Sequence, residues 1–443
     1  MKKFPNAIII ILGLLVVSWL LTYIIPSGAY DRKTNENGRV EVINDSYHYI
    51  DSEPLSFFDL MLTIPKGIEA RADLIVLILL IGGSFYVIEK TGALSEGLSK
   101  MVSMLNGKEV WALVLLAFIF MVAGATIGLQ EELIAMIPVL LLFGRSLGYN
   151  TFTILYTSFG SAIVGGAFSP SNPFAVLIAQ NEAQLPLMSG AGFRLIVLGI
   201  VFLVWVLYLL RYAHKNRIEK EALPNVNEKM PLRFSVILSL LGVTFTLVFY
   251  GIIVWDWGFQ EMSACFFVLG LAAGLIGQLG LNGTAEMYVA GFKEMIFACV
   301  VIGLAYSISL ILKDGMVIDS IVYGLFGPLK FLPPALSAVI MMIGHSVLHI
   351  PVPSYSGQAI MTMPILVPLS DLIGISRQTC VLAYQYGAVM ADMIIPTNGA
   401  LMAVLAVASV TYDKWIRFIV KPMLLILGLA ALTLIVATML ELS

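Results

Sequence analysis

The sequence predicts an all-α polytopic membrane protein made of two inverted repeats, each with a re-entrant hairpin and a broken transmembrane helix. Hydrophobic residues make up 59% of the chain and charged residues only 12%, which is about half the charged share of a soluble domain. Apolar runs long enough to cross a bilayer recur along nearly the whole length. The sequence has no basic patch with interleaved aromatic residues, so we expect membrane lipid as a partner and no nucleic acid.

The repeat is visible as five residues of the first half that recur in the second half at one constant offset. The pairs are Pro138 and Pro364, Gly148 and Gly374, Thr153 and Thr379, Pro170 and Pro396, and Asn172 and Asn398. We therefore divide the chain into an N-terminal repeat (1–212), a linker (213–232) and a C-terminal repeat (233–443). The apolar run at 7–25 is longer than the core of a signal peptide, so we expect a retained first transmembrane helix.

Basic residues set the expected orientation. Lys2, Lys3 and the basic residues of the linker place the N-terminus and the linker in the cytoplasm by the positive-inside rule. The polar stretch 27–73, with a turn-rich segment at Asn35–Gly38, then faces outward. The other apolar runs are 73–90, 110–127, 133–147, 150–182, 191–212, 234–256, 259–279, 290–312, 333–349, 356–373, 377–410 and 416–440.

Two pairs of short runs, at about 110–147 and about 333–373, are expected to be re-entrant hairpins. Both ends of the first repeat are cytoplasmic, so that repeat must cross the membrane an even number of times, and a hairpin at 110–147 satisfies this condition. The same reasoning makes the second hairpin enter from the outside. The two repeats are therefore inverted relative to each other, as in many secondary transporters.

Each repeat also contains a long apolar run, at about 150–182 and about 377–410, that is interrupted at the same place. The interruptions read Ser169-Pro170-Ser171-Asn172-Pro173 and Ile395-Pro396-Thr397-Asn398-Gly399. Proline removes a backbone donor and frees a carbonyl. Side-chain oxygens of Ser and Asn or Thr and Asn add ligands suited to Na⁺, and the new helix N-termini favour a substrate carboxylate. Two kinked helices with packed polar side chains are the alternative, but the repetition favours a binding site at the bilayer midplane.

The two predicted hairpin tips differ in charge. The first tip holds Gln130, Glu131 and Glu132, and ionisable residues inside a membrane are usually functional. Solvated, idle carboxylates at the membrane interface are the alternative. The second tip holds the polar but neutral residues Ser354, Ser356, Gly357 and Gln358, and Asp392 adds an acid shortly before the second break. We predict that both tips, Asp392 and both breaks contact substrate.

Two histidines, His345 and His349, lie four positions apart, a spacing that allows a metal or proton role on one helix face. No third ligand and no glutamate of the zinc-protease pattern accompany them, so packing is favoured and no enzymatic activity is expected. Cys265, Cys299 and Cys380 lie far apart in apolar segments and are expected to be unreactive buried thiols.

Six segments carry a family resemblance. They are Ile25–Asp31, Ile64–Gly67, Gly128–Glu132, Ser171–Phe174, Ser376–Thr379 and Ile394–Met402. On these segments the chain resembles the YfcC-like branch of the anaerobic C4-dicarboxylate carrier (DcuC-like) family, within the ion transporter superfamily. The resemblance implies an elevator-type fold like that of divalent anion/Na⁺ symporters, a homodimer held by scaffold helices, and a place in the bacterial inner (cytoplasmic) membrane.

The resemblance also implies that tips and breaks bind Na⁺ and substrate. It assigns Gly128, Gln130, Glu131, Ser171 and Asn172 to one half-site and Ser354, Ser356, Thr397 and Asn398 to the other. The Na⁺ ligands expected among them are Gly128, Ser171, Asn172, Ser354, Thr397 and Asn398.

The charges near the expected site favour an amine over a second carboxylate on the substrate. A dicarboxylate would meet Arg or Lys, but the basic residues nearest the core lie at predicted helix ends. These are Lys90, Arg145, Lys313 and Arg377. The acids at tip and break suit a basic amino acid, or they carry protons, since a partly buried Glu can titrate near neutral pH.

We therefore predict a secondary active transporter for a small organic solute, most consistent with a basic amino acid, with Na⁺ or H⁺ as coupling ion and no other cofactor. A Na⁺-coupled C4-dicarboxylate carrier is the first alternative. A channel and a substrate-binding membrane sensor are alternatives of another class, and saturable flux driven by an ion gradient distinguishes a carrier from both.

Overall fold

The computed structural model describes residues 7–34, 40–42, 46–94, 96–97, 100, 108–220, 230–255 and 257–442. This described part is mainly helical, and six of its helices are long and apolar enough to cross a membrane. They are α3 (Ala72–Thr91), α5 (Glu109–Ile127), α10 (Ala191–Lys215), α12 (Phe259–Ile276), α13 (Gly280–Asp314) and α19 (Tyr412–Met439). The predicted class of a helical, multi-pass membrane protein is confirmed.

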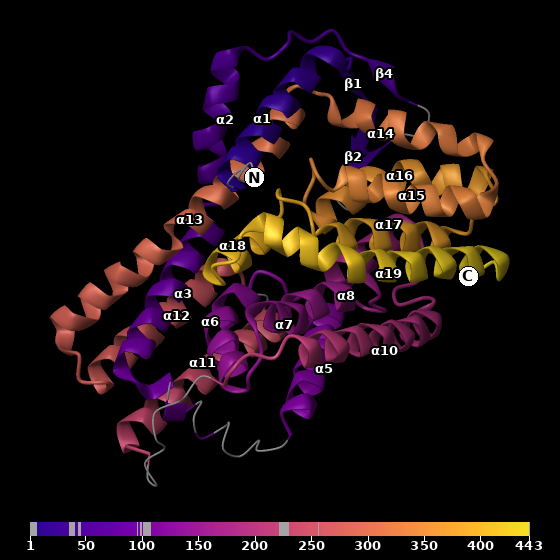
Figure 1. Ribbon diagram of the computed structural model, residues 1–443. Helices are drawn as coiled ribbons and strands as arrows, with labels where there is room; N and C mark the ends of the chain where they lie inside the picture. Colours follow the sequence, from indigo (N-terminus) through magenta and orange to yellow (C-terminus); the bar gives the residue numbers. More distant parts are fainter. Residues whose placement is uncertain are drawn as a thin grey trace, which may run out of the picture.

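One group of helices is built around α13, and we call it the α13 group. Its other members are α1 (Ala7–Ile24), α2 (Phe57–Ala70), α3, α11 (Leu232–Trp255) and α12. Helix α13 packs against α1, α2 and α3, and α12 packs against α3 and α11, on the left of Figure 1. A Cβ at Gly291 of α13 would lie 2.7 Å from the Cα of Gly83 in α3. Glycine therefore permits the close approach of these two helices, as is usual in membranes.

The second group is built around the buried helix α17, and we call it the α17 group. From the first half it includes α5, α6 (Leu133–Ser146), α7 (Thr151–Leu155), η1 (Tyr156–Gly160), α8 (Ser161–Ala167), η2 (Pro173–Leu177), α9 (Ile178–Glu182) and α10. From the second half it includes α15 (Pro334–Leu348), α16 (Tyr355–Leu372), α17 (Arg377–Ala391), α18 (Gly399–Val407) and α19. Most of these helices lie on the right and in the centre of Figure 1.

The two halves of the α17 group pack on each other in a reciprocal way. Within each half, the first hairpin helix contacts the helix before the break, as α5 contacts α8 and α15 contacts α17. Across the halves, the second hairpin helix contacts the helix after the other break, as α6 contacts α18 and α16 contacts α9. Both breaks therefore lie where the two halves meet.

Both predicted helix interruptions are present. Helix α8 ends at Ala167 and η2 begins at Pro173, while α17 ends at Ala391 and α18 begins at Gly399. Each new helix is capped by an asparagine: the Asn172 side chain accepts from two backbone amides and the Asn398 side chain accepts from the Leu401 amide at 2.6 Å. Asparagine is among the best N-cap residues because its side-chain oxygen satisfies these free donors.

Two helices were not predicted. Helix α2 lies inside the stretch expected to be polar and irregular, and it begins at a capping box in which Ser56 and Asp59 satisfy each other's backbone amides. Helix α14 (Ile318–Phe326) follows α13 and precedes the turn η3 (Gly327–Phe331). Both helices are short and amphipathic, so neither produces an uninterrupted apolar run.

The segment after α1 forms two small antiparallel ladders and packs on α14. Strand β1 (Gly28–Ala29) pairs with β4 (His48–Tyr49), and β2 (Arg32–Thr34) pairs with β3 (Val40–Val42). The predicted turn at Asn35–Gly38 lies entirely outside the described ranges. Asp319 of α14 accepts from both the Arg32 guanidinium, at 2.8 and 2.9 Å, and the Tyr30 amide, at 3.1 Å.

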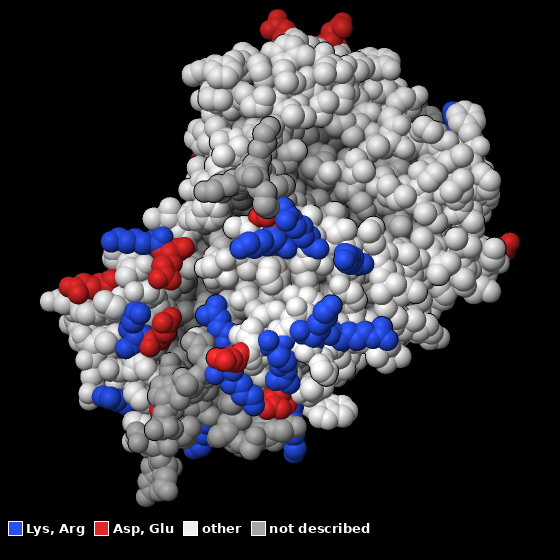
Figure 2. Space-filling view, in the orientation of Figure 1, with Lys and Arg blue, Asp and Glu red and all other residues white. Residues whose placement is uncertain are grey.

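Charged side chains are unevenly distributed over the surface. On the face shown in Figure 2, Lys and Arg gather in the central and lower part, where Figure 1 shows α6, α7 and α11. The upper part and the right edge of this face are nearly free of charge. A wide uncharged surface suits contact with lipid, because no charge there has to be desolvated.

Candidate functional site

A cavity of about 410 Å³ lies between the α13 group and the α17 group. Nine of the residues predicted to bind ion or substrate line it: Gly128, Gln130, Glu131, Glu132, Ser354, Ser356, Asp392, Thr397 and Asn398. They come from both hairpin tips and from the second break, so the fold brings together segments far apart in sequence. The volume falls within the usual range for small-molecule sites, roughly 300–1,000 Å³.

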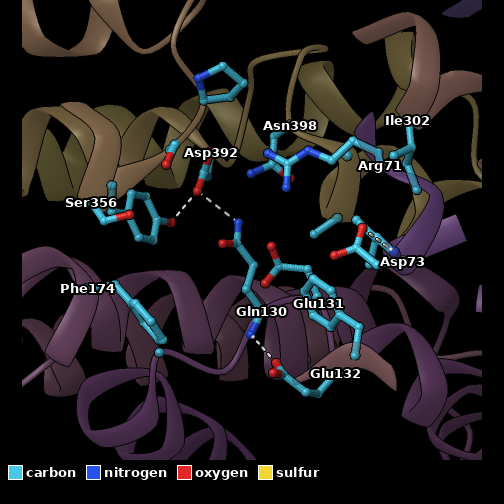
Figure 3. A pocket seen from close by; sticks show the side chains of 18 of the residues that line it. Arg71, Asp73, Gln130, Glu131, Glu132, Phe174, Ile302, Ser356, Asp392 and Asn398 are labelled. Atoms are coloured by element: carbon cyan, nitrogen blue, oxygen red, sulfur yellow. Dashed lines mark hydrogen bonds between the residues drawn. The ribbon is translucent and has the colours of Figure 1, made fainter. Parts of the chain in front are cut away.

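The first hairpin tip is turned toward the second break. Helix α5 ends at Gly128, whose φ of 69° is a left-handed conformation that favours glycine. The backbone amide of Gln130 donates to Glu132 Oε2 at 3.2 Å, and its side-chain Nε2 donates to Asp392 Oδ2 at 2.8 Å. Figure 3 shows both bonds, with Glu131 beside them in the cavity. Gln130 thus joins the first tip to the second break.

Asp392 is the most connected carboxylate of the site. Its side chain is almost fully buried, and Oδ2 accepts from both Gln130 and the Tyr355 hydroxyl. The ring nitrogen Nε2 of His349 lies 3.1 Å from Oδ1. A buried carboxylate needs such partners because desolvation of an unpaired charge costs several kcal/mol.

Three predicted site residues lie behind the cavity wall. Asn172 is buried, donates to the Gly124 carbonyl at 2.9 Å and caps η2, so it fastens the first break to α5. Ser171 donates to the Ala125 carbonyl. Gln358 is fully buried and lies between two histidines, not at the cavity. None of the three lines this cavity, and their predicted contact with ion or substrate stays a prediction.

The freed carbonyls of both breaks are satisfied by side chains from neighbouring helices. Nε2 of Gln385 donates to the carbonyls of Gly166 and Ser169, each at 3.0 Å. Trp415 and Tyr412 of α19 donate to the carbonyls of Met393 and Ile394 at the second break. Such partners are required because unpaired backbone groups inside a membrane are expensive. The Thr397 hydroxyl, by contrast, is buried at the cavity without a hydrogen-bond partner in the described structure.

Sequence reasoning missed one basic residue of the site. Arg71, between α2 and α3, lines the cavity, and its guanidinium lies over the Tyr306 ring at 4.5 Å. No carboxylate within the described ranges lies at ion-pair distance from it. The cavity therefore contains a cation that the sequence analysis did not assign to the site, although Arg71 lies at neither a tip nor a break. The only signal in the sequence is the charged pair Arg71 and Asp73 directly before an apolar run, a pattern that is equally typical of an ordinary helix end.

The cavity is acidic overall. Its charged residues are Arg71, Asp73, Glu131, Glu132 and Asp392. Figure 3 shows Arg71 and Asp73 on one side of the space, with Glu131 and Asp392 reaching into it from other segments. One cation and several acids therefore face the same volume from different elements.

A second cavity of about 580 Å³ adjoins the first. The two share Arg71, Tyr306, Pro353 and Ser354 as wall residues. The second cavity is also lined by Gly28, Ala29, Arg32 and Asp319, which belong to the segment after α1 and to α14. The second cavity therefore lies beside the segment that the sequence analysis predicts to face outward.

The histidines pack inside the second hairpin. Both are fully buried, and Gln358 lies between them. Within the described part of the chain, no cluster of three or more His, Cys, Asp or Glu is arranged to hold a metal ion. The predicted packing role of the pair agrees with these contacts, and His349 also reaches Asp392.

Comparisons with known proteins identify the family. Residues 4–439 match the family model of the C4-dicarboxylate anaerobic carriers, DcuC. The putative basic amino acid antiporter YfcC of Escherichia coli is 28% identical over 93% of this chain and 92% of its own. An uncharacterised protein of Haemophilus influenzae is 27% identical over 95% of this chain and 94% of its own.

Two solved transporter structures are also similar. YdaH of Alcanivorax borkumensis is 15% identical with a TM-score of 0.45, covering 99% of each chain. MtrF of Neisseria gonorrhoeae, from a class of antimetabolite efflux pumps, has the same identity and TM-score over 98% of this chain and 95% of its own. The family match and the apolar helices confirm the predicted resemblance: the chain belongs to the C4-dicarboxylate anaerobic carrier (DcuC) family as a YfcC-like, multi-pass membrane transporter.

Proposed function

We propose that this transporter is a secondary active carrier of an amino acid, with a basic amino acid as its preferred substrate. The observation that carries the proposal is a single cavity in which Arg71 faces Glu131 and Asp392 without an ion pair between Arg71 and either acid. An α-amino acid presents a carboxylate and an ammonium group, so it complements both signs of charge at once.

Each end of such a substrate has a matching group in the cavity. A guanidinium binds a carboxylate through two parallel hydrogen bonds, which suits Arg71 to the α-carboxylate. The start of α18 at Asn398 and the free Thr397 hydroxyl offer further donors on a neighbouring wall. The acids at the first tip then remain for the ammonium group and for a second cationic group on the side chain.

A C4-dicarboxylate fits the same charges less well. Its two carboxylates would need two cations, whereas Arg71 is the one Arg or Lys among the described lining residues and faces four acids. The similarity to the Escherichia coli protein named as a putative basic amino acid antiporter favours the same choice. Binding and uptake measurements can still support a dicarboxylate carrier, a channel or a sensor instead.

The mode of transport is also part of the proposal. We propose that the α17 group moves relative to the α13 group, carrying the hairpin tips and the second break away from Arg71 and Tyr306. The reciprocal packing of the two halves supports inverted repeats, and the position of the cavity between the groups supports such a movement. The cytoplasmic N-terminus, the bacterial inner membrane and a homodimer held by the α13 group complete the proposal, and light scattering in detergent tests the dimer.

The experiment is a binding and uptake series with purified protein, using ligands that differ by one charged group. Arginine is compared with agmatine, which lacks the carboxylate, with citrulline, which lacks the side-chain charge, and with succinate. A ligand at a hundredfold excess over its dissociation constant stabilises the folded protein by about 2.7 kcal/mol, which thermal unfolding detects. Saturable, gradient-driven uptake of arginine into proteoliposomes excludes a channel and a sensor.

Two variants assign the charges. Arg71→Gln is expected to weaken arginine binding roughly tenfold to a hundredfold, the worth of a charged hydrogen bond, and to leave agmatine unchanged. Glu131→Gln is expected to remove the preference for arginine over citrulline. The exposed variants Arg417→Gln and Glu286→Gln are the matched controls. Binding of succinate but of no amino acid would overturn the proposal.

A further inference from the structure

The contact between His349 and Asp392 contains a buried proton whose position follows from the surrounding hydrogen bonds. Gln358 lies between the two histidines, with Nε2 at 3.1 Å from the His345 carbonyl and at 3.0 Å from His345 Nδ1. A backbone carbonyl can only accept, so the amide nitrogen must face His345. The amide oxygen of Gln358 therefore faces His349.

This orientation fixes one proton on His349. Gln358 Oε1 lies 2.6 Å from His349 Nδ1, and an amide oxygen can only accept. Nδ1 of His349 therefore carries a hydrogen and donates it to Gln358. The other ring nitrogen, Nε2, is the one that faces Asp392.

A second proton must lie between His349 Nε2 and Asp392 Oδ1, which are 3.1 Å apart. It sits on the nitrogen, as imidazolium and carboxylate, or on the oxygen, as imidazole and carboxylic acid. Without it, two lone pairs would face each other in a fully buried place. We call this pair the His349–Asp392 dyad. It is neutral with its proton and carries one negative charge without it.

The groups around the dyad decide what can replace that proton. Tyr355 of α16, Tyr384 of α17 and His345 of α15 pack around the dyad and its hydrogen bonds. Glu131 and Glu132 of the first tip line the same cavity as Asp392, and Arg71 and Asp73 lie across it. The donors Gln130 and Tyr355 occupy Oδ2 of Asp392. Loss of the proton leaves a new negative charge near Glu131, and a cation in the cavity is what compensates it.

We propose that the His349–Asp392 dyad binds the coupling proton and that a basic amino acid in the cavity displaces it. The inference rests on the proposed function and extends it to the coupling ion. When the substrate cation binds beside Asp392 and Glu131, the dyad proton leaves through the cavity to water, and when the substrate leaves, a proton returns. One proton exchanges for one cationic substrate such as arginine, so the carrier is an electroneutral proton antiporter.

The direct test is proton release on substrate binding. Arginine is added to the purified transporter at neutral pH in weak buffer, and a pH-indicator dye counts the protons released per arginine bound. We expect close to one proton in the wild type, and an arginine affinity that rises roughly tenfold per pH unit while the dyad is protonated. In His349→Gln and Asp392→Asn, which keep hydrogen-bonding side chains, we expect the arginine that binds to release no dyad proton and to bind without this pH dependence. Asp392→Asn should also bind arginine more weakly, because it removes an acid beside the substrate cation.

Controls separate the dyad from the fold and from the proposed function. His48→Gln changes an exposed histidine of β4 and is expected to release protons like the wild type. Thermal unfolding of each variant shows whether it is folded. If one variant does not fold, the number of protons released per arginine by the wild type, and the pH dependence of its arginine affinity, still test the proposal. Arginine binding without proton release, or release unchanged in both dyad variants, overturns the dyad assignment and leaves the proposed function standing. Failure of every amino acid to bind overturns both.

Discussion

Replacement of Gln385 by leucine tests how the first break is held open. Gln385 lies on α17 and is fully buried; its oxygen accepts from the Arg194 guanidinium, and its nitrogen donates to the carbonyls of Gly166 and Ser169. Leucine has a similar volume but can make none of these bonds. The substitution therefore leaves a buried cation and two backbone carbonyls short of partners.

The expected cost follows from the three bonds. A hydrogen bond to a charged group contributes roughly 1.5–3 kcal/mol and a neutral one roughly 1 kcal/mol, with more lost when a buried partner is left unsatisfied. Gln385→Leu should therefore lower the free energy of unfolding by about 4 kcal/mol, a large share of the 5–15 kcal/mol typical of folded proteins. Arg194 keeps its bond to Gln378 at 2.9 Å, so part of its solvation is retained.

The assay is thermal or denaturant unfolding of the detergent-solubilised protein, followed by intrinsic tryptophan fluorescence. The matched control is Gln278→Leu, because Gln278 also accepts from an arginine, Arg233, at 2.6 Å but at an exposed site. Exposed polar pairs contribute about 0–1 kcal/mol, so the control should change stability little. Equal and small effects of the two substitutions would refute the claim that Gln385 stabilises the first break.

Two further predictions concern the α13 group. Gly291→Ala places a Cβ 2.7 Å from the Cα of Gly83 and should destabilise the contact of α3 with α13 by roughly 1–3 kcal/mol. The control is Gly428→Ala, because nothing lies within 4 Å of a Cβ at that position. Thermal unfolding measures the stability of both variants. Hydrogen bonds from the Ser56 hydroxyl and amide lower the pKa of Asp59 below its usual range. The cap therefore stabilises α2 fully when the pH is above the unfolded pKa of about 3.9. This stabilisation is lost as the pH falls through the lower pKa that Asp59 has in the folded state. Hydrogen exchange of the first turn of α2, corrected for intrinsic rates, should rise as the pH falls below about 4 in the wild type, and a pH-independent rate there would contradict the role of the cap.

The parts of the fold that were predictable are those encoded locally. Each break depends on a Pro and an Asn within five consecutive residues, followed by Pro173 in the first and Gly399 in the second. These residues act on their own backbone wherever the helix lies. The acidic first tip was predictable for a similar reason, since Glu131 and Glu132 stand out in an apolar stretch. Both signals can be recognised in the sequence without knowing which residues pack against these segments.

The parts that could not be predicted depend on contacts between distant segments. Arg71 looks like an ordinary helix end until α2 and α3 place it at the cavity beside Tyr306. Arg194, near the start of α10, reads as an interfacial charge, yet it is buried against Gln378 and Gln385 of the other half. Sequence patterns show which residues are polar, but not which polar residues meet.

Asp392 illustrates why contacts between residues far apart in the sequence determine function. Its carboxylate contacts Gln130 from the first hairpin and Tyr355 and His349 from the second, while the residue itself precedes the second break. A change in its charge therefore alters the electrostatic environment of both tips and of the second break. If a proton and a cationic substrate alternate at this carboxylate, both loaded states keep it neutralised, whereas in the empty, deprotonated state it carries an uncompensated buried charge. The same contacts that bind the substrate would then disfavour movement of the empty, deprotonated carrier, which is the condition for tight exchange.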